Sequence, residues 1–475
     1  MALKPTDPRT LHDANDTPGD GIRPGTGPGA RATLVAALLG FALITLDASV
    51  VNVALPAVEG ELGGGLSGLQ WVVDGYTLAF AALMLSTGAL SDRIGARRAY
   101  AAGVAVFTLA SAGCGLAPGL EALIGARVVQ GMAAAVMLPA SLALVRQAFP
   151  DAGPRARAVA LWAAGGSVAV ALGPVAGGAL TTAWDWRAIF FVNLPAGAAA
   201  LVLLARTPRS RRRPAPLDLP GQLTAATGIA ALTFAVIEGG RAGLVALVVG
   251  VVALAAFLAV ESRHPHPVVP LGLFRDRAVS VPVAVGAANS VAFYGIVFVL
   301  SLFFQQQRGQ SALAAGLMFL PMTALIPVVN ILAGRLAGRY GPRLPMLVGQ
   351  LVAASGALLL LPVTARTPAP LVAALTVPLA LGAALTIPPL TSALMEAVPA
   401  ARAGLAAGVL NAARQTAGGL AVAAFGALVA DGFVTGMRTS LLISAGLLTL
   451  TALATGLATA RSRAGSGPAA ARTPS

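Results

Sequence analysis

The stretch Leu46-Asp47-Ala48-Ser49-Val50-Val51-Asn52-Val53-Ala54-Leu55-Pro56 places one carboxylate inside an otherwise apolar run that covers residues 32–58. A run of this length can cross the hydrocarbon core of a bilayer, which is about 30 Å thick. At ~1.5 Å per residue, Asp47 is roughly 22 Å into the span that starts at Ala32. A charge at that depth costs several kcal/mol, so Asp47 must face a partner or a water-filled cavity and is a functional candidate.

The composition requires a nonpolar environment for much of this 475-residue chain. Hydrophobic residues make up 57% of the sequence and charged residues 11%, whereas soluble domains carry about 25% charged residues. The net charge of +14 suggests a nucleic-acid partner, but the arginines are dispersed through short loops, as the basic loops of membrane proteins are. We therefore expect a lipid bilayer, and no nucleic acid, as the partner of this surface.

Residues suited to catalysis or metal binding are scarce. One cysteine, Cys114, and three histidines leave no cluster with metal-ligand spacing. No phosphate-binding loop of the form Gly-x-x-x-x-Gly-Lys-Ser/Thr occurs, so the sequence does not support ATP drive within this chain. We expect no enzyme activity, no metal and no cofactor, with a proton gradient as the energy source.

Fourteen apolar runs follow one another along the chain. They are long, rich in Ala, Leu and Gly, and lack period-two alternation, which favours membrane-spanning helices over strands. The runs cover residues 32–58, 68–90, 99–117, 120–145, 157–181, 187–205, 219–238, 242–260, 278–304, 312–334, 344–362, 369–396, 404–430 and 438–460. Residues 1–31 are predicted as a disordered cytoplasmic tail, and residues 461–475 as a second cytoplasmic tail.

The distribution of Lys and Arg predicts the orientation of these spans. With the N-terminus in the cytoplasm, 25 of the 32 Lys and Arg residues lie on the cytoplasmic side and 5 on the outer side, while Arg127 and Arg414 lie within spans. Such an excess places both termini in the cytoplasm. It also requires an even number of spans. The expected location is a bacterial cytoplasmic membrane.

A short repeat divides the chain into halves. Residues 88–97 (GALSDRIGAR) and 334–343 (GRLAGRYGPR) share Gly, Leu, Arg, Gly and Arg at matching places. If each copy follows the second span of its half, residues 32–205 and 278–460 each form a six-helix bundle. Residues 206–277 are then two inserted helices with their cytoplasmic loops. Paired repeats that enclose a midplane site are typical of secondary transporters. The predicted fold is an all-α integral membrane protein with 14 transmembrane helices.

Three charged residues within spans are candidates for proton coupling. Burial favours the neutral form of a carboxyl group, so Asp47 can act as a proton acceptor, although a carboxylate bonded only for packing is an alternative. Arg127 and Asp74 lie about one turn nearer the outer surface than Asp47. The guanidinium can reach either acid. A static Asp74–Arg127 ion pair and a proton-coupled exchange of partners are both compatible with the sequence.

The first copy of the repeat is a candidate gating loop. Its relevant residues are Gly88, Asp92, Arg93, Gly95 and Arg97. A basic cytoplasmic loop is the simple interpretation of these residues. The functional interpretation is a latch that forms and breaks as the two bundles rock.

Small residues crowd the fifth span, where Gly173, Pro174, Gly177 and Gly178 lie close together. Small side chains allow close approach of helices, and an interior proline kinks a helix. The sequence leaves two interpretations open. These residues serve packing alone, or they form a bend in the helix that determines on which side of the membrane the transporter leaks.

Polar residues in other spans are candidates for a substrate cavity. They are Asn52, Asn330, Asn411, Arg414 and Gln415. Asn411 and Gln415 are four residues apart and share a helix face. Arg414 lies deep enough in its span that it needs a partner or a water-filled cavity.

These motifs resemble those of the major facilitator superfamily, and within it the family of fourteen-span drug:proton antiporters. The resemblance covers nearly all of residues 32–460 and rests on five stretches. They are residues 46–56, 88–98, 123–131, 173–178 and 186–195. Residues 320–331 further resemble exporters of the methylenomycin-resistance type, which implies a protein that expels a toxic compound in exchange for entering protons.

The resemblance also implies roles for single residues. Asp47 matches the family's proton-coupling acid and Arg127 its buried relay arginine. Asp92 and Arg93 match its gating loop, and Gly173 with Pro174 matches its antiport kink.

The chain departs from the family pattern at three places. Ala160 and Ala169 stand where the fullest fifth-span motif has Gly, and Ala96 stands where the loop has a basic residue. The first two substitutions imply looser helix packing there, and the third implies a weaker latch.

The sequence therefore predicts a monomeric, proton-coupled antiporter that exports small drug-like or antibiotic molecules by alternating access. A proton-coupled importer of a small metabolite has the same fold and stays open as an alternative, as does a lipid flippase. A membrane-embedded sensor or enzyme would need a catalytic cluster or a soluble domain, and the loops are too short to hold one.

Overall fold

The computed structural model describes residues 28–207, 210, 218–264, 267, 269, 271–399, 403–430 and 432–464. Most of the two predicted tails, 1–31 and 461–475, lies outside these residues, as does much of the stretch 208–217. Every regular element in the described part of the chain is helical, which agrees with the all-α prediction.

The α-helices follow one another with short connections. They are α1 (Pro28–Leu62), α2 (Gly65–Ile94), α3 (Ala96–Gly115), α4 (Leu120–Ala148), α5 (Ala152–Ala183), α6 (Ala188–Phe191), α7 (Asn193–Ala205), α8 (Leu219–Glu238), α9 (Gly240–Arg263), α10 (Arg277–Leu302), α11 (Ala312–Ala324), α12 (Ile326–Tyr340), α13 (Arg343–Leu359), α14 (Ala369–Glu396), α15 (Ala403–Ala430) and α16 (Phe433–Ala464). A 3-10 helix, η1 (Leu271–Arg275), precedes α10, and a π-helical turn, η2 (Phe303–Gln307), continues it.

Each of the fourteen apolar ranges holds one α-helix or two consecutive ones. The paired cases are α6 with α7 and α11 with α12, which break at Val192 and Leu325. Pro195 and Pro327 lie two or three residues after these breaks. A proline has no N–H to donate to the carbonyl one turn earlier, so the helical hydrogen bonding is interrupted just before each of these prolines. In the described residues, ten helices or helix pairs are long and apolar enough to cross a membrane.

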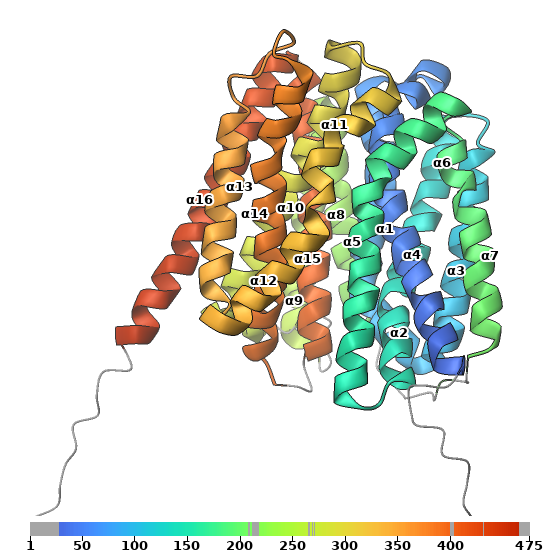
Figure 1. Cartoon of the computed structure of the whole chain (residues 1–475), viewed down its shortest axis with the longest axis vertical. Helices are drawn as coiled ribbons and strands as arrows, with labels where there is room; N and C mark the ends of the chain where they lie inside the picture. The colour runs from blue at the N-terminus through green and yellow to red at the C-terminus, as the bar shows by residue number, and fades with distance from the viewer. Residues whose placement is uncertain are drawn as a thin grey trace, which may run out of the picture.

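The helices pack in two sets that share one pattern of neighbours. In the first set α1 packs on α5, α4 packs on both α2 and α3, and α3 packs on α7. In the second set α10 packs on α15, α14 packs on α11, α12 and α13, and α13 packs on α16. Figure 1 shows the two sets side by side, with the first in blue to green and the second in yellow to red.

The two sets meet through equivalent helices. α5 packs against α11, and α15 packs against α2. The pair α8 and α9, which comes between the sets in sequence, attaches through α8 to both α2 and α15, while α9 packs mainly on α8. Apolar side chains of α9 such as Val245 and Val252 are therefore more than half exposed.

The two copies of the sequence repeat, 88–97 and 334–343, also share a backbone conformation. Gly95 joins α2 to α3 with φ 92°, and Gly341 lies between α12 and α13 with φ 79°. Both values lie in a region that side chains with a Cβ rarely adopt. The same glycine-dependent turn therefore ends the second span of each half.

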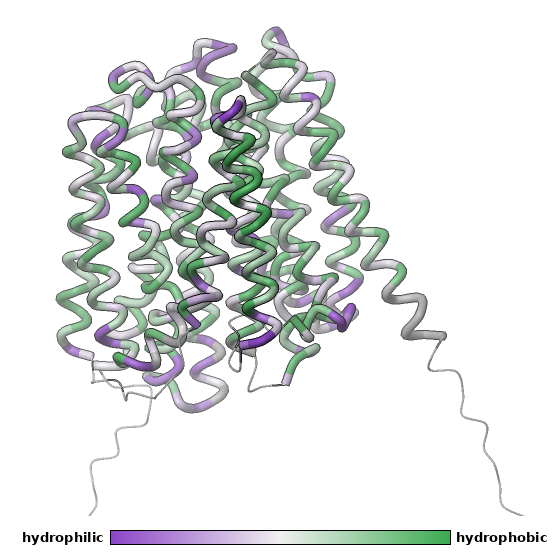
Figure 2. The backbone as a smooth tube through the Cα atoms, turned by 180° about the vertical axis from the view of Figure 1, so that it is seen from behind, coloured by the Kyte–Doolittle hydropathy of each residue, from purple (hydrophilic) through white to green (hydrophobic). Residues whose placement is uncertain are grey.

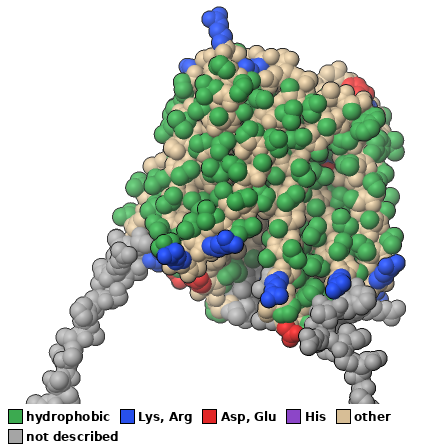
Figure 3. All heavy atoms as spheres, viewed as in Figure 1, with side chains coloured by type: hydrophobic (Ala, Val, Ile, Leu, Met, Phe, Trp, Pro, Cys, Tyr) green, Lys and Arg blue, Asp and Glu red, His purple; other side chains and the backbone are tan. Residues whose placement is uncertain are grey.

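The surface of the bundle is that of a membrane protein. Hydrophobic residues run along the middle of the helices, and hydrophilic ones gather mainly at their ends (Figure 2). The space-filling view shows hydrophobic side chains around the middle, with Lys and Arg at the rims (Figure 3). α1 begins and α16 ends at the same end of the bundle (Figure 1). The chain is a multi-pass membrane protein.

The two halves are hydrogen-bonded to each other at the end of the bundle where α1 finishes. There Ser301 Oγ donates to the Asn52 carbonyl at 2.6 Å, and Gln305 Nε2 donates to the Val53 carbonyl at 3.0 Å.

Candidate functional site

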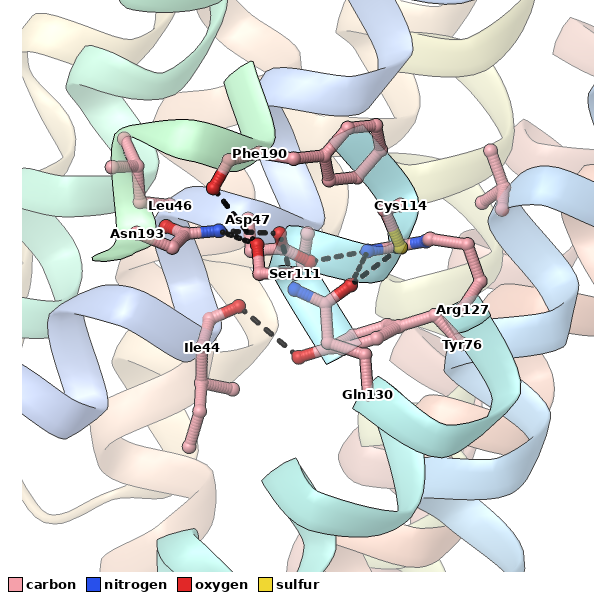
Figure 4. A network of polar contacts seen from close by, with 12 residues as sticks. Ile44, Leu46, Asp47, Tyr76, Ser111, Cys114, Arg127, Gln130, Phe190 and Asn193 are labelled. Carbon is pink, nitrogen blue, oxygen red and sulfur yellow. Dashed lines mark hydrogen bonds and ion pairs between the residues drawn. The ribbon is translucent and has the colours of Figure 1, made fainter. Parts of the chain in front are cut away.

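Asp47 is enclosed within the first set of helices and has no exposed surface. Arg127 of α4 donates to Asp47 Oδ2 and forms a buried ion pair with it. The other carboxylate oxygen, Oδ1, accepts from Gln130 Nε2 and from Asn193 Nδ2, each at 2.9 Å. Three donors from α4 and α7 thus surround one carboxylate of α1, as Figure 4 shows.

Arg127 has two further hydrogen-bond acceptors and an aromatic ring around it, besides Asp47. Its Nε donates to the Val72 carbonyl at 3.1 Å and its Nη1 also donates to Gln130 Oε1 at 2.8 Å. The guanidinium carbon lies 4.3 Å from the centre of the Tyr76 ring, within the range of a cation–π interaction. Arg127 is 1% exposed, so this interaction and the ion pair are both largely shielded from water.

A glycine positions this arginine. Gly131 lies one turn beyond Arg127 on α4, and a Cβ there would overlap the backbone carbonyl of Tyr76. The bare glycine lets α4 approach α2 closely. The close approach brings Arg127 within reach of the Val72 carbonyl and the Tyr76 ring.

Gln130 and Asn193 belong to the site but were not predicted as site residues from the sequence, although both lie in stretches that resemble family motifs. Gln130 Oε1 accepts from Cys114 Sγ at 3.6 Å, and Asn193 Nδ2 also donates to Ser111 Oγ at 3.0 Å. A signal was available for Gln130, because it is three residues from Arg127 and shares its helix face. Asn193 gave no such signal, because 146 residues separate it from Asp47.

Asp74 lies apart from this ion pair. Of the described donors, Thr77 Oγ1 on the same helix reaches Asp74 Oδ1 at 3.2 Å, and the buried Oδ2 has no hydrogen-bond partner. Gly419 of α15 faces this carboxylate, since a Cβ there would come 3.2 Å from Oδ1. Arg127 thus pairs with Asp47 in this conformation, and Asp74 faces the boundary between the two halves.

A small cavity of about 20 Å³ lies at that boundary. It is lined by Ala48, Asn52, Val73, Thr77, Tyr294, Gln415, Gly418, Gly419 and Val422. This volume holds about one water molecule. Asn52 lines this cavity, and its Nδ2 donates to the Ala48 carbonyl at 3.2 Å.

The remaining cavity candidates have separate surroundings. Asn330 Nδ2 donates to Ser167 Oγ of α5 at 3.3 Å and so links the two halves. Asn411 Nδ2 donates to the Ala407 carbonyl of its own helix at 3.0 Å. Gln415 lines the cavity, and Arg414 lies beside it on α15 with its Nε buried and without a partner among the described residues.

The glycines of α5 make contact with both halves. A Cβ on Gly173 would overlap Ser49 of α1, and one on Gly177 would lie 2.6 Å from the Val50 carbonyl. A Cβ on Gly178 would overlap the Ala312 carbonyl of α11, in the other half. α5 continues through Pro174 as a single helix. Close packing against α1 and α11 is therefore the observed role of these glycines.

The candidate gating loop surrounds the turn at Gly95. Gly88 has open space beside it, Arg93 is exposed, and the side chain of Asp92 lies outside the described residues. Arg97 donates through Nε to the Leu204 carbonyl at 3.1 Å, at the end of α7. This arginine therefore anchors the loop to α7, within its own half.

Comparison with known sequences places the chain in a family. Residues 37–423 match the sequence profile of the Major Facilitator Superfamily. The chain belongs to the Major Facilitator Superfamily. The family resemblance drawn from the motifs is thus confirmed, and the chain is a membrane transporter, not an enzyme.

Two curated relatives are similar over most of their length. Multidrug resistance protein Stp of Mycobacterium tuberculosis (strain CDC 1551 / Oshkosh) is 40% identical over 410 residues, which cover 84% of this chain and 75% of that protein. Methylenomycin A resistance protein of Streptomyces coelicolor is 38% identical over 408 residues, which cover 84% of this chain and 86% of that protein.

A solved structure shares the fold. The crystal structure of a mutant of a peptide transporter, POT, in complex with sulfate superimposes with a TM-score of 0.69 at 17% identity, covering 94% of this chain and 96% of that chain. This likeness concerns the arrangement of helices alone.

Proposed function

We propose that this chain is a proton-coupled antiporter that exports small drug-like or antibiotic molecules across a bacterial cytoplasmic membrane. The names of the two relatives, multidrug resistance and methylenomycin A resistance, support the substrate class. The buried ion pair of Asp47 and Arg127 carries the proposal of proton coupling. The chain uses the proton gradient and no cofactor, and it works as a monomer.

We propose fourteen crossings with both termini in the cytoplasm. The beginning of α1 and the finish of α16 at one end of the bundle support an even number of crossings (Figure 1). The excess of Lys and Arg in the segments at that end supports a cytoplasmic location for it. Residues 32–205 and 278–460 are the two six-helix bundles, and residues 206–277 form the inserted pair, in agreement with the two packing patterns.

Protonation of Asp47 is the proposed coupling step. A proton that adds to Asp47 Oδ2 neutralises the carboxylate and removes its ionic attraction to Arg127. Arg127 keeps the Val72 carbonyl, Gln130 Oε1 and the Tyr76 ring, so its charge stays stabilised while the bond to Asp47 weakens. Because α1, α4 and α7 meet at this carboxylate, its protonation changes the contacts between them.

Alternating access follows from where this carboxylate lies. α1 also contacts the other half through the Asn52 and Val53 carbonyls. A movement of α1 therefore changes the hydrogen bonds that join the two halves at this end of the bundle. The proton enters from outside as the drug leaves, and it is released inside before the next drug molecule binds.

The variant Asp47→Asn tests this proposal. It keeps the shape of the side chain and removes the proton site, so efflux driven by a pH gradient should be lost. The measurement is dye or drug efflux from inverted membrane vesicles, normalised to the amount of protein in the membrane. Efflux at the wild-type rate would exclude Asp47 as the coupling residue.

Glu121→Gln is the matched control. Glu121 lies in the first turn of α4 on an exposed surface. The substitution makes the same chemical change as Asp47→Asn, on the helix that carries Arg127, and should leave efflux unchanged. Equal loss in both variants would indicate a general effect on charge or folding.

A further inference from the structure

Arg414 is a cation inside the membrane that has no counter-ion in the described part of the chain. Its Nε is buried and lacks a hydrogen-bond partner, and none of the ion pairs of the described residues includes it. Arg414 as a whole is partly exposed, so its guanidinium is not fully enclosed, and a charge inside the membrane favours an anionic partner. Arg127, by contrast, has an anion, two carbonyl-type acceptors and an aromatic ring around it.

The surroundings of Arg414 hold the side chain in place. The bare face of Gly286 on α10 accommodates its stem, because a Cβ there would come 3.2 Å from Cγ and 3.3 Å from Cδ of Arg414. Ser290 follows four residues later on the same face of α10. Ser290 is 1% exposed, and its hydroxyl also has no partner among the described residues.

This group lies next to the cavity between the halves. Gly418, one turn beyond Arg414 on α15, lines the cavity, as does Tyr294, one turn beyond Ser290 on α10. Asp74 faces the adjacent Gly419 with its buried Oδ2 unpartnered. Among the described residues, a cation without a counter-ion and a carboxylate oxygen without a hydrogen-bond partner therefore lie near the cavity between the halves.

We infer that Arg414, assisted by the Ser290 hydroxyl, binds an acidic group of the transported compound. An arginine does not release its proton in proteins, so this cation serves to attract an anion and not to carry protons. A carboxylate that enters with the substrate would satisfy the guanidinium in a charge-assisted hydrogen bond. The cationic or donor part of the same compound would then face Asp74. This inference rests on the proposed function and adds the substrate class, which is a zwitterion or an acid.

A matched pair of dyes tests the assignment. One probe is a rhodamine with a free carboxylate, and the other is the methyl ester of the same rhodamine. Binding to the purified full-length protein in nanodiscs is measured by fluorescence anisotropy, and export is measured separately in energised inverted vesicles. The variants are Arg414→Gln and Arg414→Lys, with Arg335→Gln, an exposed arginine of α12, as control.

The wild type should prefer the acid to its ester. A hydrogen bond to a charged group is worth about 1.5–3 kcal/mol, so Arg414→Gln should weaken binding of the acid roughly tenfold or more and change binding of the ester less than about twofold. Arg414→Lys should keep part of the preference. The control variant should bind both dyes as the wild type does.

Three results would overturn the inference. They are a wild type that binds the acid no better than the ester, an Arg414→Gln variant that keeps the full preference, and an Arg414→Gln variant that loses both dyes equally. A wild type that shows the expected preference in nanodiscs and exports neither dye would instead contradict the proposed export function. The inference on binding would then still hold.

Discussion

The two arginines inside the spans occupy opposite situations in two halves that pack alike. Arg127 is sealed within the first half against a carboxylate from α1. Arg414 lies on α15, the equivalent of α5 in the second half, with no carboxylate beside it among the described residues. The first half thus encloses a paired charge, whereas the second half holds a charge without a counter-ion among the described residues. A charge with a buried counter-ion suits proton coupling, and a charge without a counter-ion suits the binding of a charged substrate.

Removing each arginine should have opposite effects on stability. Arg127→Leu leaves the Asp47 carboxylate buried without its cation, which costs about 3–5 kcal/mol. Arg414→Leu removes an uncompensated charge, so stability should be unchanged or increased. The check is Tm in detergent together with the yield of folded protein. Equal losses in both variants would mean that Arg414 has a structural partner.

The glycines beside the two arginines should also differ. A Cβ on Gly131 would overlap backbone of α2, which cannot move aside, so Gly131→Ala should cost about 3 kcal/mol through overpacking. A Cβ on Gly286 would meet side-chain atoms of Leu410 and Arg414, which can shift. Gly286→Ala should therefore be milder in the same Tm assay. A reversed order would contradict the described packing of α4 on α2.

The repeated turns should behave alike, in contrast to the arginines. Gly95 and Gly341 both have positive φ, so Ala at either position adds strain of about 2 kcal/mol. The decrease in Tm of Gly95→Ala and Gly341→Ala should agree within the error of the measurement. A large effect at one turn and none at the other would show that the halves are not equivalent at this point.

The smallest contrast concerns two asparagines. Asn193 donates to Asp47 and Ser111, whereas Asn411 donates to a carbonyl of its own helix. Asn193→Ala should lower the free energy of unfolding by roughly 1 kcal/mol. Because Asp47 keeps its other two donors, proton-driven efflux should be slowed and not abolished. Asn411→Ala should leave the free energy of unfolding within about 0.5 kcal/mol of the wild type, with a correspondingly small change in Tm. Equal effects on efflux would remove Asn193 from the site.

Much of the helical frame could be predicted from the sequence because hydropathy and proline are local signals. The fourteen apolar ranges each hold helix, and the breaks at Val192 and Leu325 fall just before prolines. The partner of Arg127 could not be predicted. Asp47 and Asp74 lie at similar depth, and depth alone cannot say which acid a guanidinium meets.

The sequence by itself determined that Asp47 lies in a span, that Arg127 and Arg414 lie in others, and that glycines end the repeated helices. Only the tertiary structure decided that Asp47 meets Arg127, 80 residues away, that Asp74 faces Gly419 across the boundary of the halves, and that Arg414 packs on Gly286 next to the residues that line the cavity there. The physical reason is the rotation of each helix about its axis. Close contacts at residues such as Gly131 set that rotation, and it depends on the neighbouring helix as much as on the helix's own sequence.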